Sequence, residues 1–141
     1  MGIPKPEAAT RGGRVAYLPL DEVGPGADAG RTDGFIKILA GPRPVLRSVG
    51  GEQILGATIV AERASEMIAE IALAMHTGMF AGRLAQATHA YPTWSSGVQL
   101  TAAQLVVEIG GRKARPAEAV AGTSTPNVAL RRGGMPEHLS G

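Results

Sequence analysis

The sequence predicts an α+β fold, in which an antiparallel sheet of three or four strands carries helices packed on one face as a two-layer sandwich. Three observations lead to this prediction. Short runs rich in β-branched and aromatic residues occur before Glu62, the hydrophobic period then changes from two to about 3.6, and turn residues separate the runs. Strands that precede helices along the chain are typical of an α+β arrangement.

The composition limits both the size of the fold and its chemistry. The chain has 141 residues, of which 44% are hydrophobic, and this is enough for one packed core and therefore for one domain. The formal net charge is +2, and residues 110–141 carry the excess, with five Lys or Arg against two Glu. The five aromatic residues do not adjoin a basic cluster, which argues against a nucleic-acid partner.

Two absences in the sequence exclude further classes of protein. There is no cysteine, so disulfides, thiolate metal sites and dithiol redox chemistry are excluded within this chain. The first residues lack the apolar segment of a signal peptide, and no run approaches the roughly 18 apolar residues of a membrane span. We therefore expect a cytoplasmic protein with no membrane contact.

Three segments are predicted to form strands. Residues 1–13 are rich in Pro and Gly and form a lead-in, after which residues 14–18 alternate polar and apolar side chains as an edge strand. Residues 34–39 form the second strand, because β-branched and aromatic residues fill it. Residues 53–60 repeat the pattern after a long connection, which predicts an antiparallel hairpin.

Three helices are predicted after the strands. The first begins near Glu62 and ends before Gly78, a residue suited to the left-handed position that follows a helix. Its apolar stripe consists of Ala64, Met67, Ile68, Ile71, Ala72 and Met75. A short second helix covers residues 79–86. Thr93 is predicted to cap a third helix that ends at the Gly110-Gly111 pair. The stripe of that helix consists of Trp94, Val98, Leu105 and Ile109.

Beyond Gly111 the hydrophobic periodicity disappears, and Pro, Gly, Ser, Thr and Arg are scattered through the remaining residues. This composition predicts that residues 111–141 form a mostly disordered tail without an ordered element. The predicted domain therefore spans residues 14–110.

Three segments of the sequence occur in an order and spacing that point to a known family. They are residues 32–37 (TDGFIK), residues 54–60 (ILGATIV) running into 64–68 (ASEMI), and residues 89–97 (HAYPTWSSG). In these segments the chain resembles the C-terminal dimerisation domain of the pyridine nucleotide-disulfide oxidoreductases, the family of glutathione reductase, dihydrolipoamide dehydrogenase and mercuric reductase.

The resemblance implies a parent enzyme of three parts, with an FAD domain, an NAD(P)H domain and this domain last in the chain. No G-x-G-x-x-G follows a strand and opens a helix here, and the Gly24-Pro25-Gly26 stretch lacks that context. This chain alone is therefore expected to hold no cofactor. The family's redox cysteine pair lies in the FAD domain, in agreement with the absence of cysteine here.

In this family, the loop before the last helix reaches across a two-fold axis and lines the flavin of the partner subunit. It usually reads His-Pro-Thr-x-x-Glu, in which the His is an acid/base and the Glu orients its ring. Aligned on Pro92 and Thr93, this sequence has Tyr91 at the histidine position and Ser96 at the glutamate position. The resemblance implies that Tyr91 and Pro92 contact the partner's flavin, that no catalytic residue is present, and that the Tyr91-Pro92 bond is cis.

The role of Tyr91 has two open interpretations. Mercuric reductase also has a tyrosine at this position, so a phenol is compatible with an enzyme that needs no proton relay, although that enzyme's C-terminal cysteine pair has no counterpart here. Alternatively, Tyr91 is a packing residue or contacts the flavin edge through its backbone carbonyl, with no acid/base role. His89 is either a functional group or a loop histidine bonded to backbone. His76 suits the end of a helix, and three scattered histidines predict no metal site.

Two hypotheses of function follow from the sequence. The first is an obligate homodimerisation module of an FAD-dependent NAD(P)H:disulfide oxidoreductase, with an isologous interface and no catalytic activity alone. The second is a free-standing α+β scaffold or binding protein derived from such a reductase. A hydrolase using Ser95 or Ser96 is disfavoured, because no recognisable base and carboxylate accompany either serine.

Overall fold

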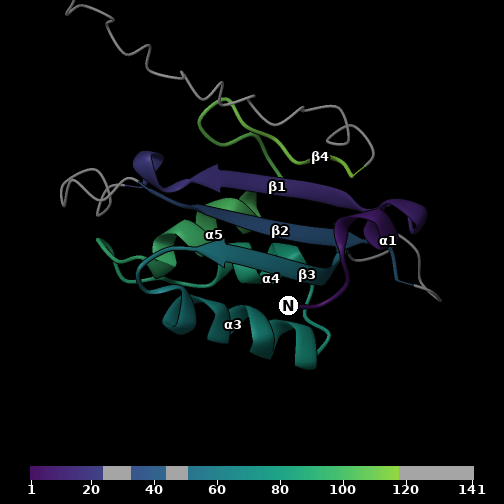
Figure 1. Ribbon diagram of the computed structural model, residues 1–141, viewed down its shortest axis with the longest axis horizontal. Coiled ribbons are helices and arrows are strands. Elements are labelled where there is room, and N and C mark those ends of the chain that lie inside the picture. Colours follow the sequence, from purple (N-terminus) through teal and green to yellow (C-terminus); the bar gives the residue numbers. More distant parts are fainter. Residues whose placement is uncertain (24–32, 44–50, 118–141) are drawn as a thin grey trace, which may run out of the picture.

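A computed structural model of the chain describes residues 1–23, 33–43 and 51–117. Its centre is a four-stranded sheet in the order β3-β2-β1-β4, in which neighbouring strands are antiparallel (Figure 1). The strands are β1 (Arg14–Pro19), β2 (Phe35–Gly41), β3 (Gln53–Val60) and β4 (Arg115–Pro116). With the helices that follow β3, this sheet confirms the predicted α+β fold class.

Alternation along the strands divides their side chains between two faces of the sheet. On β2, Ile36 and Ile38 are fully buried in the main core, whereas Leu39 belongs to a second cluster on the opposite face. The register of β2 and β3 shifts between Leu39 and Ala40, so that Leu55 is the extra residue of a bulge. Leu55 consequently packs against the second cluster.

Three helices enclose the main core. They are α3 (Ala64–His76), α4 (Ala81–Gln86) and α5 (Ser95–Ala103). Figure 1 shows α4 and α5 behind the sheet and α3 alongside β3. Buried residues of all three helices join the same core as the strands, among them Met67, Ile71, Leu84 and Val98. The helices that hydrophobic periodicity predicts are therefore present, and they share one core.

The end of α3 confirms the prediction made from Gly78. This residue has φ +63°, the left-handed conformation. Its N–H donates to the carbonyl of Met75 at 3.1 Å, and the N–H of Met79 donates to the carbonyl of Ala74 at 2.8 Å. The two bonds form a Schellman motif, which ends α3 and turns the chain toward α4.

A helix that the sequence does not predict covers part of the opposite face. It is α1 (Lys5–Thr10), which lies across one end of the sheet in Figure 1. Its Ala8 is fully buried in the second cluster together with Val15, Leu39 and Ala117. The lead-in expected over residues 1–13 is therefore partly helical. Proline is compatible with this helix because it stands in the first turn, where N–H groups need no acceptor within the helix.

The strand β4 corrects two predictions about the chain ends. Its two residues pair with the first two residues of β1, so the beginning of β1 is not at the edge of the sheet. Farther along β1, the N–H of Tyr17 donates to Oε1 of Gln104 at 3.2 Å. An ordered element thus exists beyond Gly111, where the sequence predicts none. It is held there because Ala117, which is 1% exposed, fills the second cluster.

The helix α5 ends earlier than predicted. The Gly110-Gly111 pair, with φ values of +55° and +73°, forms a two-residue turn in which Ile109 and Arg112 exchange N–H···O bonds of 2.8 Å. Two consecutive positive φ angles favour glycine in such a turn. Leu105 remains in the main core although it lies beyond the helix. Its burial explains why the apolar spacing predicts a longer helix.

Some predicted features fall outside the described residues, namely the Gly24-Pro25-Gly26 stretch and the tail from residue 118 onward with His138. Within the described ranges, no helix is both long and apolar enough to cross a membrane. The same ranges contain no group of three or more His, Cys, Asp or Glu able to hold a metal ion.

Candidate functional site

The segment between α4 and α5, residues 87–94, contains the residues that the sequence analysis singles out, and we call it the Tyr91 loop. The peptide bond between Tyr91 and Pro92 is cis, which confirms the prediction. Tyr91 is 79% exposed, more than any other exposed large hydrophobic residue in the described part of the chain. The loop therefore presents an aromatic side chain to the surroundings of the domain.

Hydrogen bonds fix the backbone on both sides of Tyr91. Nε2 of Gln99, on α5, donates to the carbonyls of Ala85 and Ala87 at 3.2 and 2.9 Å. The hydroxyl of Thr93 donates to the carbonyl of Ala90 at 2.6 Å. The carbonyls at the end of a helix have no N–H donor within the helix, and Gln99 donates to two of those at the end of α4. The loop is therefore held while the ring of Tyr91 stays exposed.

Thr93 does not cap α5, and that prediction is wrong. Trp94 is the N-cap residue, and no side chain makes a capping hydrogen bond there. The helix begins instead with tight turns, in which the N–H groups of Ser96 and Gly97 donate to carbonyls three residues earlier. The Thr-x-x-Ser pattern is misleading because both hydroxyls donate to backbone carbonyls and neither accepts from a free N–H.

Ser96, at the position of the family's glutamate, is 7% exposed. Its hydroxyl donates to the carbonyl of Thr93 at 2.6 Å. The hydroxyl is thus engaged within the first turn of α5. A serine in this position cannot supply the carboxylate that orients a catalytic imidazole.

His89 joins the Tyr91 loop to α3. Its Nδ1 lies 2.9 Å from the carbonyl oxygen of Ala87, and its Nε2 lies 2.8 Å from Oε2 of Glu70. The backbone contact is the one expected of a loop histidine, but the sequence analysis missed Glu70. A single acidic residue on a helix gives no signal of a partner 19 residues away. His76 lies in the last turn of α3, as predicted.

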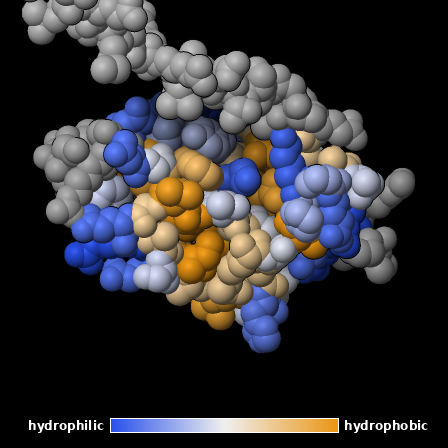
Figure 2. Space-filling view, viewed as in Figure 1, coloured by the Kyte–Doolittle hydropathy of each residue, from blue (hydrophilic) through white to orange (hydrophobic). Residues whose placement is uncertain are grey.

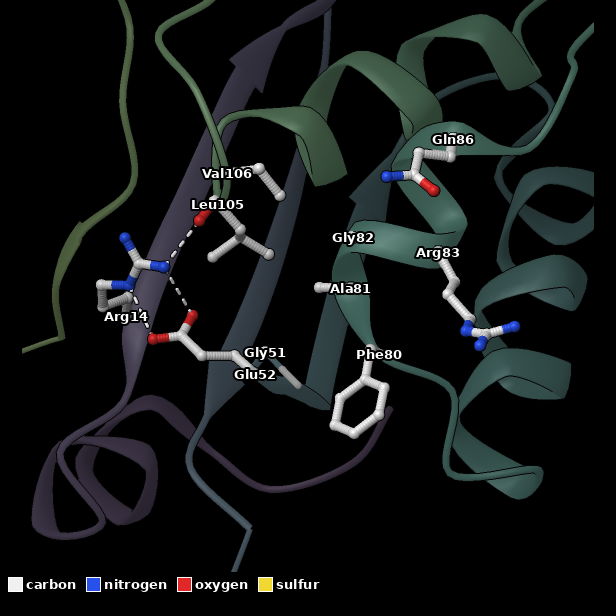
Figure 3. A pocket seen from close by; sticks show the side chains of 10 residues that line it. All are labelled: Arg14, Gly51, Glu52, Phe80, Ala81, Gly82, Arg83, Gln86, Leu105 and Val106. Atoms are coloured by element: carbon white, nitrogen blue, oxygen red, sulfur yellow. Dashed lines mark hydrogen bonds and ion pairs between the residues drawn. The ribbon is translucent and has the colours of Figure 1, made fainter. Parts of the chain in front are cut away.

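A pocket of about 610 Å³ lies beside α4, and Tyr91 and Pro92 are not among its lining residues. Figure 3 shows Arg14 facing Glu52 on one side and Gln86 extending from α4 on the other. Arg14 donates to both carboxylate oxygens of Glu52, at 2.7 and 2.9 Å, and to the carbonyl of Leu105 at 2.6 Å. The Arg14 charge is therefore neutralised within the domain, and the lining contains no nucleophile with an adjacent base.

Hydrophobic residues also reach the surface of the domain. Figure 2 shows a group of them in the middle of the face seen in Figure 1, with hydrophilic residues around it. Exposed large hydrophobic residues of the described ranges include Tyr17 on β1, Val60 on β3 and Leu73 on α3. An apolar group surrounded by hydrophilic surface, as in Figure 2, is common where proteins associate.

The fold and the loop define a class of protein, an α+β domain that presents an aromatic loop at its surface. The family model described as "Pyridine nucleotide-disulphide oxidoreductase, dimerisation domain" matches residues 1–102. The chain therefore belongs to this family of dimerisation domains, as the resemblance implies.

Curated relatives and a solved structure agree with this membership. The chain is 39% identical to dihydrolipoyl dehydrogenase of Geobacillus stearothermophilus over 56% of its length, and 32% identical to that of Bacillus subtilis (strain 168) over 66%. It spans only 15% and 18% of those two proteins. The crystal structure of LpdA from Mycobacterium tuberculosis matches with a TM-score of 0.64 at 30% identity, over 76% of this chain and 22% of that one.

Proposed function

We propose that the chain is a homodimerisation module of an FAD-dependent NAD(P)H:disulfide oxidoreductase and that its Tyr91 loop contributes to the flavin site of the partner subunit. The observation that carries the proposal is the Tyr91 loop itself, whose backbone is bonded to the side chains of Gln99 and Thr93 and which leaves Tyr91 79% exposed. A rigid, exposed aromatic group is well suited to a contact with a planar cofactor or a partner subunit.

The proposal assigns a contact to Tyr91 and no proton transfer. Tyr91 and Ser96 take the places of an imidazole and a carboxylate, and the Ser96 hydroxyl is already bonded to the carbonyl of Thr93. A phenol and a hydroxyl so arranged do not form the acid/base pair of the family. FAD and NAD(P)H belong to the parent enzyme, which we place in the cytoplasm, and the chain alone is inactive.

Two measurements on the purified chain test this proposal. Light scattering at micromolar concentration is expected to give the mass of a dimer, because domains of this kind associate through large apolar interfaces. Titration of FAD is expected to leave flavin absorbance and fluorescence unchanged, because the loop is only one wall of a pocket. A chain that scatters as a monomer contradicts the dimer, and tight binding of FAD contradicts the assignment of an incomplete site.

The genomic sequence upstream of the Met1 codon separates the two hypotheses of function. A reading frame for an FAD domain there is expected if the chain serves a reductase. Its absence would support a free-standing scaffold or binding protein that no longer acts in such an enzyme.

A further inference from the structure

The side chain of His89 is held between two oxygen atoms. Its Nδ1 is 2.9 Å from the carbonyl oxygen of Ala87, the residue that follows α4, and its Nε2 is 2.8 Å from Oε2 of Glu70. The side chain is 7% exposed, so little water competes for either nitrogen. His89 therefore spans from the end of α4 to the surface of α3.

Both contacts require a proton between the bonded atoms. A carbonyl oxygen only accepts, so Nδ1 carries a hydrogen atom. A second proton lies between Nε2 and Oε2, on the imidazole or on the carboxyl group. In either arrangement the pair as a whole is neutral, and the two hydrogen bonds hold the ring in one orientation. With the proton on the imidazole the bond is charge-assisted, and such a bond is stronger than one between neutral groups.

Glu70 has a fixed position because α3 packs against the sheet. Met67, Ile71 and Ala74 on the same helix are each no more than 1% exposed and belong to the main core. The other carboxylate oxygen of Glu70, Oε1, is buried and has no hydrogen-bond partner among the described residues. Glu70 thus leaves its buried Oε1 unpaired while Oε2 contacts His89. The unpaired oxygen costs free energy, and the hydrogen bond to His89 is expected to offset that cost.

We propose that His89 and Glu70 are positioning residues for the Tyr91 loop, and this inference rests on the proposed function of that loop. His89 lies two residues before Tyr91, in a segment whose other end is held by Thr93 and whose start is held by Gln99. The His89–Glu70 contact ties the middle of the segment to α3. The tie fixes the direction in which Tyr91 leaves the domain, before any partner is bound.

Backbone ¹⁵N relaxation measured by NMR tests the tie in the full chain. Glu70→Ala is expected to lower the order parameters of residues 88–91 from about 0.85, the value of a rigid backbone, to below about 0.6, because the loop loses its hydrogen bond to α3. The amides of Ile36 and Ile71, in the core, are expected to keep their order parameters. Unchanged order parameters in the loop, or an equal fall in the core, overturn the proposal.

Two control variants test whether the effect of Glu70→Ala comes from the lost hydrogen bond, from the lost charge or from a less stable helix. Glu70→Gln retains a side chain that can donate to a neutral imidazole, so the order parameters of its loop are expected to stay within about 0.1 of the original. Glu66→Ala removes an exposed carboxylate one turn earlier on α3, which pairs with Arg63 and not with the loop. It is expected to leave the loop unchanged. Loosening of the loop by either variant contradicts the assignment.

His89→Asn removes the same contact and provides a second test if Glu70→Ala fails to fold. The shorter side chain cannot reach Glu70, and the same fall in the order parameters of residues 88–91 is expected. In the double variant, the effects should not add, because one contact accounts for both. Additive effects overturn the proposal. Light scattering on the same samples reports the dimer independently. A monomeric original chain contradicts the proposed function, and the order parameters still test the His89–Glu70 contact.

Discussion

At the scale of single residues, long-range ion pairs connect parts of the chain that the sequence does not link. Glu22, in the short helix η1 (Leu20–Glu22), bonds with Arg112 of the glycine turn, 90 residues away. The hydrogen bond from the Arg112 side chain lowers the pKa of Glu22 below its ordinary value. Both side chains are 39% exposed, so solvent screens the pair and its contribution to stability is small.

The sign of this shift gives a prediction about pH. Because the pKa of Glu22 is lowered by folding, its stabilising contribution is present above the ordinary carboxyl pKa and is lost as pH falls through the lowered value. In an NMR titration, Glu22 is expected to titrate at lower pH than an unpaired glutamate, and Arg112→Gln is expected to raise its midpoint. An identical midpoint in both proteins would show that the pair does not form in solution.

Single residues were also where inference from the sequence was weakest. The cis bond at Tyr91 could be predicted because an aromatic residue before proline favours it and the family carries it. The role of Thr93 was predicted wrongly, because a hydroxyl near a helix start either accepts from a free N–H or donates to a carbonyl. Glu70 could not be predicted, since its partner is brought to it only by the tertiary fold.

At the scale of elements, α3 is the best predicted part of the fold. Its strong hydrophobic period of 3.6 residues predicted the buried face, and Gly78 predicted where the helix ends. Ile71→Ala is expected to lower the free energy of unfolding by about 2–5 kcal/mol, because Ile71 is fully buried against the sheet. Leu73→Ala, on the exposed side of the same helix, is expected to change it by less than about 0.5 kcal/mol. Equal losses in chemical denaturation would contradict the orientation of α3.

The strand β4 and the helix α1 are the elements that the sequence did not predict. Two residues of strand and six of helix are too short to show a hydrophobic period, and both are held by the second cluster. Ala117→Asp would place a charge in that cluster and is expected to cost more than about 2 kcal/mol. Arg115→Asp, at an exposed position of β4, is the control and should change the melting temperature little. If Ala117→Asp left the stability unchanged, β4 would not belong to the folded domain.

At the scale of the whole molecule, the arrangement of the strands, the helices and the Tyr91 loop agrees with the family resemblance seen in the sequence. The order of the elements and the TDGFIK, ILGATIV and HAYPT segments were sufficient to predict the fold and the family. Hydrophobic period and local turn chemistry carry that information. The Arg14–Glu52 pocket and the His89–Glu70 tie could not be predicted, because each joins residues from elements far apart in the chain.

The bond from Tyr17 to Gln104 has a consequence for how two copies of the chain can meet. A row of unpaired N–H groups along an edge strand can pair with a strand of another chain, and this can lead to uncontrolled polymerisation. Here β4 covers the start of β1, and the side-chain oxygen of Gln104 accepts from the next N–H on the same side of the strand, that of Tyr17. Two copies that meet at this border are therefore expected to contact each other through side chains and not by extending the sheet.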